Sequence, residues 1–136
     1  MSPSKQEKIF RPEYALELIE IAKGDLNTAI VIMTSPAARL ENAFYMIQQC
    51  IEKGLKAVLV HRGLPVPLVH DLGVLLAKLP ADLQPPFGYE LSDLNQYASI
   101  RRYELGSFEL TQEEIEIVLE KGKLMLEWCQ QVLGVG

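Results

Sequence analysis

Long apolar runs are missing from this sequence. The most apolar stretches, such as residues 29–33, are interrupted by a polar residue within a few positions. A bilayer span needs roughly 20 consecutive apolar residues. The first residues also lack the apolar core of a secretory signal. We therefore expect a cytoplasmic protein without membrane segments.

Cysteine, histidine and positive charge are also scarce. The chain has two cysteines, Cys50 and Cys129, and two histidines, His61 and His70, at spacings that match no zinc template. Both cysteines lie in apolar helical pattern, which predicts buried, reduced thiols. The net charge of −5 gives no general attraction to nucleic acid or anionic lipid, so any anion site must be local. No phosphate loop or nucleophile elbow is present, and we expect neither metal nor cofactor.

What the sequence has is helical periodicity. With 136 residues and 49% apolar content, the chain can form one domain around one core. No segment shows the period-two alternation of a strand. We expect an all-α, up-down bundle of four or five helices over 12–136, after a flexible lead-in at 1–11. Apolar residues three and four apart predict helices at 12–33, 37–62, 72–79, 91–103 and 111–133.

Four local signals mark the ends of these helices. Ser35, before Pro36, is a candidate N-cap for the second helix, and Gly63 should end it. Thr111 with Glu114 three residues later is a capping-box pattern at the start of the last helix, and Gly134 should close that helix.

The second helix carries two apolar stripes and one narrow polar stripe. The apolar stripes indicate packing on more than one flank, at the centre of a bundle or in a dimer interface. Gln49, Lys53 and Lys56 lie at i, i+4 and i+7, beside Glu52. Two interpretations stay open. The stripe is either a solvated face with an ordinary Glu52–Lys56 pair or a surface that holds a ligand.

Several pieces of this region, in order, resemble the HEPN family, small prokaryotic helical domains often encoded beside minimal nucleotidyltransferases. They lie within AFYMIQQCIEKGLKAVLVHRGLPVPLVHDLGVLL and are Gln48-Gln49, Glu52-Lys53, Lys56-Ala57, Gly63, the proline-bearing loop and His70-Asp71-Leu72. Downstream, YASIRRYE looks like the family's segment of tyrosine and arginine before the last helix. The resemblance covers about residues 13–132.

The resemblance implies a helical bundle that is commonly a homodimer. It also implies binding of a nucleotide or of nucleic acid such as RNA, in concert with a nucleotidyltransferase partner. Many relatives are toxins of toxin–antitoxin pairs that cleave RNA with an Arg-x4–6-His motif near the end of the fourth helix. Here Arg101 and Arg102 stand at the matching place, but no histidine follows them, and Arg62 and His70 are separated by seven residues.

The missing histidine favours a non-catalytic binding subunit. The alternatives are a HEPN ribonuclease toxin with an unconventional site, or a dimeric helical scaffold. His70, with Asp71, stands where a helix begins, so it is a candidate for capping backbone N–H groups as well as for contacting a ligand. The residues that we expect to bind a nucleotide or phosphate are Gln49, Lys53, Lys56, His70, Arg102 and Tyr103.

Overall fold

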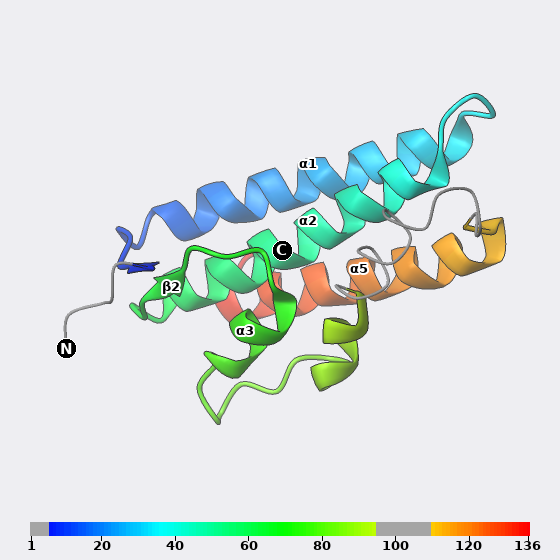
Figure 1. Cartoon of the computed structure of the whole chain (residues 1–136). Helices are drawn as coiled ribbons and strands as arrows, with labels where there is room; N and C mark the ends of the chain where they lie inside the picture. The colour runs from blue at the N-terminus through cyan, green and yellow to red at the C-terminus, as the bar shows by residue number, and fades with distance from the viewer. Residues whose placement is uncertain (1–5, 95–109) are drawn as a thin grey trace.

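Three long helices form the body of the molecule in the computed structural model, which describes residues 6–94 and 110–136 (Figure 1). Helix α1 spans Tyr14–Thr34, α2 spans Leu40–His61 and α5 spans Gln112–Leu133. Helices α1 and α2 are antiparallel neighbours, and α5 runs beside α2 in the same bundle (Figure 1). The predicted all-helical bundle is confirmed.

Helix α5 begins and ends as its sequence predicts. The Thr111 hydroxyl accepts a hydrogen bond from the Glu114 backbone N–H (3.1 Å), and the Glu114 carboxylate accepts one from the Thr111 N–H (3.0 Å). This reciprocal capping box satisfies two backbone donors that the first helical turn leaves free. Gly134 follows the helix in the left-handed conformation, as a C-terminal glycine commonly does.

Helix α2 lies at the centre, because it packs against both α1 and α5. Its core residues are almost completely shielded from solvent, and Leu55 and Val58 are not exposed at all. Two glycines let α2 and α5 approach closely. A Cβ atom on Gly122 of α5 would lie 2.8 Å from Ile47 Cγ2, and one on Gly54 of α2 would lie 2.9 Å from Cys129 Sγ. The two apolar stripes are therefore covered within one chain.

Smaller elements lie beside the three helices. Strands β1 (Glu7–Lys8) and β2 (Val66–Pro67) pair antiparallel, and the short helix α3 (Leu72–Ala77) and the 3-10 helix η1 (Gly88–Ser92) follow. The sequence shows no period-two alternation at these strands, because a strand of two residues is too short to alternate. Strand β1 also gives a paired position to part of the segment that was expected to be a flexible lead-in.

The connection between α1 and α2 differs from the prediction. Ser35 was expected to cap the second helix, but it is the residue at which α1 ends. Its carbonyl accepts a hydrogen bond from the Ala38 N–H (3.3 Å), so residues 35–38 form a turn. Helix α2 begins later, after Arg39, which makes no side-chain cap. Most of the helix predicted at 91–103 lies outside the described residues.

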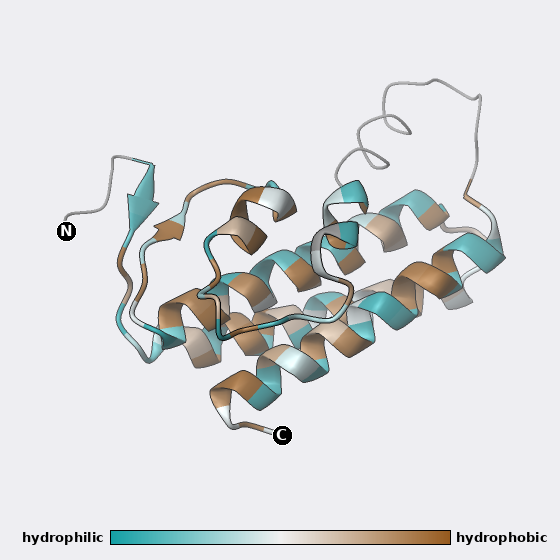
Figure 2. Cartoon of the chain, turned by 90° about the horizontal axis from the view of Figure 1, so that it is seen from below, coloured by the Kyte–Doolittle hydropathy of each residue, from teal (hydrophilic) through white to brown (hydrophobic). Residues whose placement is uncertain are grey.

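Hydropathy follows the helical repeat in each of the long helices. Hydrophilic and hydrophobic residues alternate every few positions, as amphipathic helices require (Figure 2). In the parts of the chain that the structure describes, no helix is both long and apolar enough to cross a membrane.

Candidate functional site

A buried carboxylate lies at the centre of the candidate site. Glu52 is the only charged side chain buried among residues 6–94 and 110–136, with a side chain 3% exposed. Its Oε1 atom lies 2.9 Å from Nδ1 of His70, and its Oε2 atom lies 3.3 Å from Nζ of Lys56. One carboxylate thus connects the next turn of α2 to the loop that leads into α3.

The start of α3 places His70 next to α2. The Asp71 carboxylate accepts hydrogen bonds from the N–H groups of Gly73 (2.8 Å) and Val74 (3.4 Å), as an N-cap does. His70, one residue earlier, turns to Glu52 instead. The helix-capping role considered for His70 therefore belongs to Asp71 alone, because the imidazole is engaged by the buried carboxylate.

The imidazole of His70 is exposed, and one of its two nitrogens contacts the buried carboxylate. The His70 side chain is 83% exposed, although its Nδ1 atom meets a carboxylate that is almost completely buried. An ionised carboxylate only accepts hydrogen bonds, so Nδ1 must carry the proton. Nε2 makes no hydrogen bond to the residues that the structure describes. This nitrogen is the atom of the cluster that can meet a ligand.

The residues of the polar stripe of α2 make contacts with two different parts of the molecule. Lys53 Nζ lies 2.7 Å from Asp25 Oδ2, so Lys53 ties α2 to α1 and not to the Glu52 cluster. Gln49, one turn earlier on the same face, is half-buried. Of the four predicted ligand residues that the structure describes, only Lys56 and His70 come together, both at Glu52. Arg102 and Tyr103 lie outside the described residues.

Sequence reasoning missed the role of Glu52. Its pairing with Lys56 was foreseen as part of a solvated face, but the pair is largely buried: the Lys56 side chain is only 16% exposed. Removing a charged pair from water costs free energy, and a fold tolerates this cost when both charges have partners. The available signal was the position of Glu52, between the polar stripe and an apolar stripe.

The second pairing considered for catalysis, Arg62 with His70, is not formed. The Arg62 guanidinium is paired with Asp82, and its hydrogen bond lowers the pKa of Asp82 from the ordinary value. His70 is held by Glu52. Each residue of this candidate pair is therefore engaged elsewhere.

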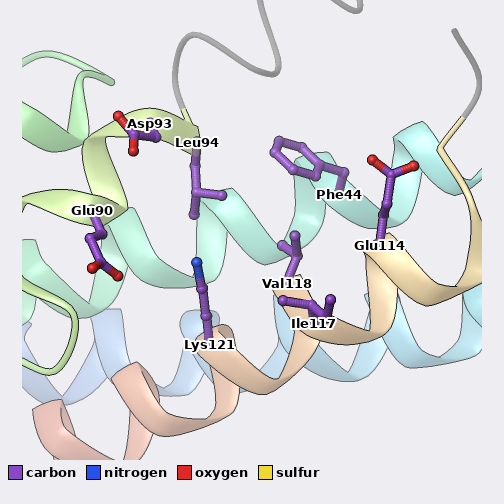
Figure 3. A pocket seen from close by; sticks show the side chains of 8 residues that line it. All are labelled: Phe44, Glu90, Asp93, Leu94, Glu114, Ile117, Val118 and Lys121. Atoms are coloured by element: carbon purple, nitrogen blue, oxygen red, sulfur yellow. The ribbon is translucent and has the colours of Figure 1, made fainter.

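A separate hollow of about 440 Å³ lies between α2, α5 and the segment around η1 (Figure 3). Phe44, Leu94 and Val118 give it an apolar floor, and carboxylates and one ammonium group stand around it. The polar lining residues are Glu90, Asp93, Glu114 and Lys121. Three carboxylates against one lysine do not suit a phosphate, and none of the predicted ligand residues within 6–94 and 110–136 lines the hollow.

The two cysteines have no role in the candidate site. Both are free and buried, as predicted. Burial raises the pKa of the Cys50 thiol to about 12 and also raises that of Cys129. A thiolate is the form that attacks electrophiles and binds metals, so these thiols are inert. Among the described residues, no group of three or more potential ligands could hold a metal ion.

Comparisons with known proteins agree with this fold. The family model described as HEPN domain matches residues 15–132. Among solved structures, the chain is similar to the crystal structure of TT1696 from Thermus thermophilus, with a TM-score of 0.74. The two are 24% identical, and the match covers 88% of this chain and 98% of that one. A comparison with curated proteins gave no match.

Proposed function

This chain belongs to the HEPN domain family, and from that premise we propose that it is a non-catalytic binding subunit. It holds a nucleotide or a nucleic acid for a separate minimal nucleotidyltransferase, as part of a pair of the toxin–antitoxin kind. The observation that carries the proposal is the Lys56–Glu52–His70 cluster, where an exposed imidazole is anchored to a buried carboxylate. The identity of the partner rests on the family resemblance.

The sequence supports binding over cleavage. RNA cleavage by the family motif needs an imidazole to move a proton and a guanidinium to hold the phosphate charge. The chain has only two histidines, His61 and His70, and neither follows an arginine at the Arg-x4–6-His spacing. The residues for holding a ligand are present, whereas the catalytic pair is not.

A titration with a nucleoside triphosphate tests the binding role. We expect His70→Ala and Arg102→Ala each to weaken affinity about tenfold, the effect of losing one charge-assisted hydrogen bond. Lys23→Ala is the control, because Lys23 is an exposed α1 residue that pairs with Glu20. Absence of binding by the unmodified protein overturns the proposed function, and unchanged affinity in both variants overturns the site.

Copurification tests the partner. The minimal nucleotidyltransferase encoded nearest to this chain is coexpressed with it, and the complex is isolated through a tag on one partner. We expect the two chains to elute together at a fixed ratio. Elution of the two as separate species contradicts the partnership, whatever the outcome of the nucleotide titration.

The homodimer belongs to the same proposal. Ile117 and Leu124 are exposed apolar residues seven positions apart, and so lie on one face of α5. We expect Ile117→Glu to shift the protein from dimer to monomer in sedimentation equilibrium. Glu116→Gln, at a neighbouring exposed position, is the control. A monomer in the unmodified protein contradicts this part of the proposal.

Ribonuclease activity is the second candidate, and one observation favours it. An imidazole held by a buried carboxylate is an arrangement used for general acid–base catalysis. If His70 acts in this way, the purified protein cleaves RNA and His70→Gln abolishes the cleavage. We expect no cleavage by either protein.

A further inference from the structure

The charges around the candidate site are almost balanced. Lys53 is neutralised by Asp25 and Lys56 by Glu52, so neither lysine brings a surplus positive charge to a ligand. Three titratable groups of the described elements face His70. They are Glu52 and Lys56 of α2 and Asp71 at the start of α3. Asp71 is negative and is engaged by backbone N–H groups. With a neutral His70 the charges of these described groups sum to −1, because Asp71 is the one charge left unbalanced, and a proton on His70 raises the sum to 0. Protonation of His70 is therefore the change that makes this part of the site less repulsive to an anion.

The orientation of the ring determines what that proton does. Because Nδ1 donates to Glu52, a neutral His70 presents the lone pair of Nε2 to the outside. The oxygens of an ionised phosphate are also acceptors, so they cannot form a hydrogen bond with that nitrogen. When the ring is protonated, Nε2–H donates, and the bond to a phosphate becomes charge-assisted.

We propose that a phosphate group bound at this cluster takes up one proton on His70, and that Glu52 is the positioning residue that holds the ring with Nε2 outward. The inference rests on the proposed function, because it assigns a mechanism to the same site. No covalent bond to the ligand is formed. The proton comes from solvent, resides on Nε2 and returns to solvent when the ligand leaves.

Linkage gives the direction of the pH effect. If phosphate binds only the protonated ring, the affinity for phosphate is highest at low pH and falls as the imidazole loses its proton. The fall is about tenfold per pH unit, because one proton is taken up with each ligand. Imidazoles titrate between about pH 5 and 8, so the change lies in an accessible range.

The chain offers a matched pair of variants for the test, because His61 and His70 are its only histidines. A nucleoside triphosphate is titrated into the unmodified protein, His70→Gln and His61→Gln. The binding titration is repeated at several pH values from about 5.5 to 8.5, a range that brackets the imidazole titration. Gln cannot titrate, and its amide can still donate to Glu52. The triphosphate has a titration of its own, which cancels when affinities are compared with those of His70→Gln.

We expect the affinity of the unmodified protein to fall with pH relative to His70→Gln, and His61→Gln to follow the unmodified protein. Calorimetry in two buffers should show uptake of up to one proton, which His70→Gln loses. A pH profile identical to that of His70→Gln overturns this inference alone. Absence of binding at every pH overturns the proposed function as well.

Nitrogen NMR tests the role of Glu52 without a ligand. Two imidazoles give two sets of signals, and His61→Gln assigns them. We expect neutral His70 to carry its proton on Nδ1 in the unmodified protein and to show a mixture of tautomers in Glu52→Gln, whose amide can donate or accept. An unchanged tautomer means that Glu52 does not position the ring. If Glu52→Gln does not fold, Glu52→Asp replaces it, since the shorter side chain withdraws the carboxylate from Nδ1.

Discussion

The Glu52–Lys56 ion pair lends itself to a quantitative test, because the chain contains an exposed counterpart. Glu52 and Lys56 lie 3.3 Å apart on α2, with side chains 3% and 16% exposed. Glu20 and Lys23 lie 3.4 Å apart on α1, with side chains 71% and 41% exposed. The two pairs have similar lengths, at i,i+4 and i,i+3 spacing, and differ strongly in burial. Glu52 also contacts His70, but a double-mutant cycle cancels interactions that only one residue of a pair makes. A double-mutant cycle on each pair therefore isolates the effect of burial.

The expected magnitudes follow from that burial. Breaking a fully buried pair costs about 3–5 kcal/mol. Lys56 is long and partly exposed, so its ammonium can move toward solvent when its partner is removed. We therefore expect Glu52→Gln to lower the free energy of unfolding by about 2 kcal/mol, with a coupling energy between Glu52 and Lys56 of about 1–2 kcal/mol. For the exposed Glu20–Lys23 pair we expect a coupling energy of about 0.3 kcal/mol.

Urea denaturation followed by circular dichroism measures these energies. The variants are Glu52→Gln, Lys56→Met and the double change, with Glu20→Gln, Lys23→Met and their double change as the reference cycle. Equal slopes with denaturant across each cycle show that the unfolded states are comparable. Equal coupling energies in the two cycles would refute the reasoning, because burial would then add nothing to the Glu52–Lys56 pair.

Four further predictions concern packing at two glycines, thiol reactivity and capping. Gly24→Ala should stabilise the protein by about 0.5–1 kcal/mol, because no atom lies within 4 Å of a Cβ there. Gly122→Ala should destabilise it by about 1 kcal/mol in the same denaturation assay, since the new Cβ meets Ile47 at 2.8 Å. Alkylation of Cys50 should require unfolding, because burial raises its pKa to about 12; rapid labelling of the native protein at about pH 8, near the pKa of a free thiol, contradicts this. Thr111→Ala should cost about 1 kcal/mol by removing the N-cap of α5, and an unchanged urea midpoint would show that the capping box contributes nothing.

Local sequence patterns predicted helix ends correctly where the residues that form the end lie within a few positions of one another. The capping box at Thr111 and the glycine after Leu133 depend on residues a few positions apart, and both were found as expected. The start of α2 was misplaced because Ser35 and Pro36 fit either a helix start or a turn. The choice between a helix start and a turn at these residues depends on how α1 packs against its neighbours.

The candidate site was predicted in part. Lys56 and His70 were selected separately, one from the polar stripe and one from the family resemblance. Their meeting at Glu52 could not be read from the sequence, because Glu52 and His70 lie 18 positions apart along the chain. The same limit explains Lys53, whose partner Asp25 lies on another helix, 28 residues away.

The sequence by itself determined the helical class, the apolar flanks of α2, the capped ends of α5 and the absence of the Arg-x4–6-His motif. These properties depend on residue type and on spacing within one or two helical turns. The tertiary structure alone decided that Lys53 serves the contact between α1 and α2, that Asp71 caps α3, and that a buried Glu52 joins Lys56 to His70. The physical reason is that a charged side chain changes its role when packing removes water from it, and packing is a property of segments distant in sequence.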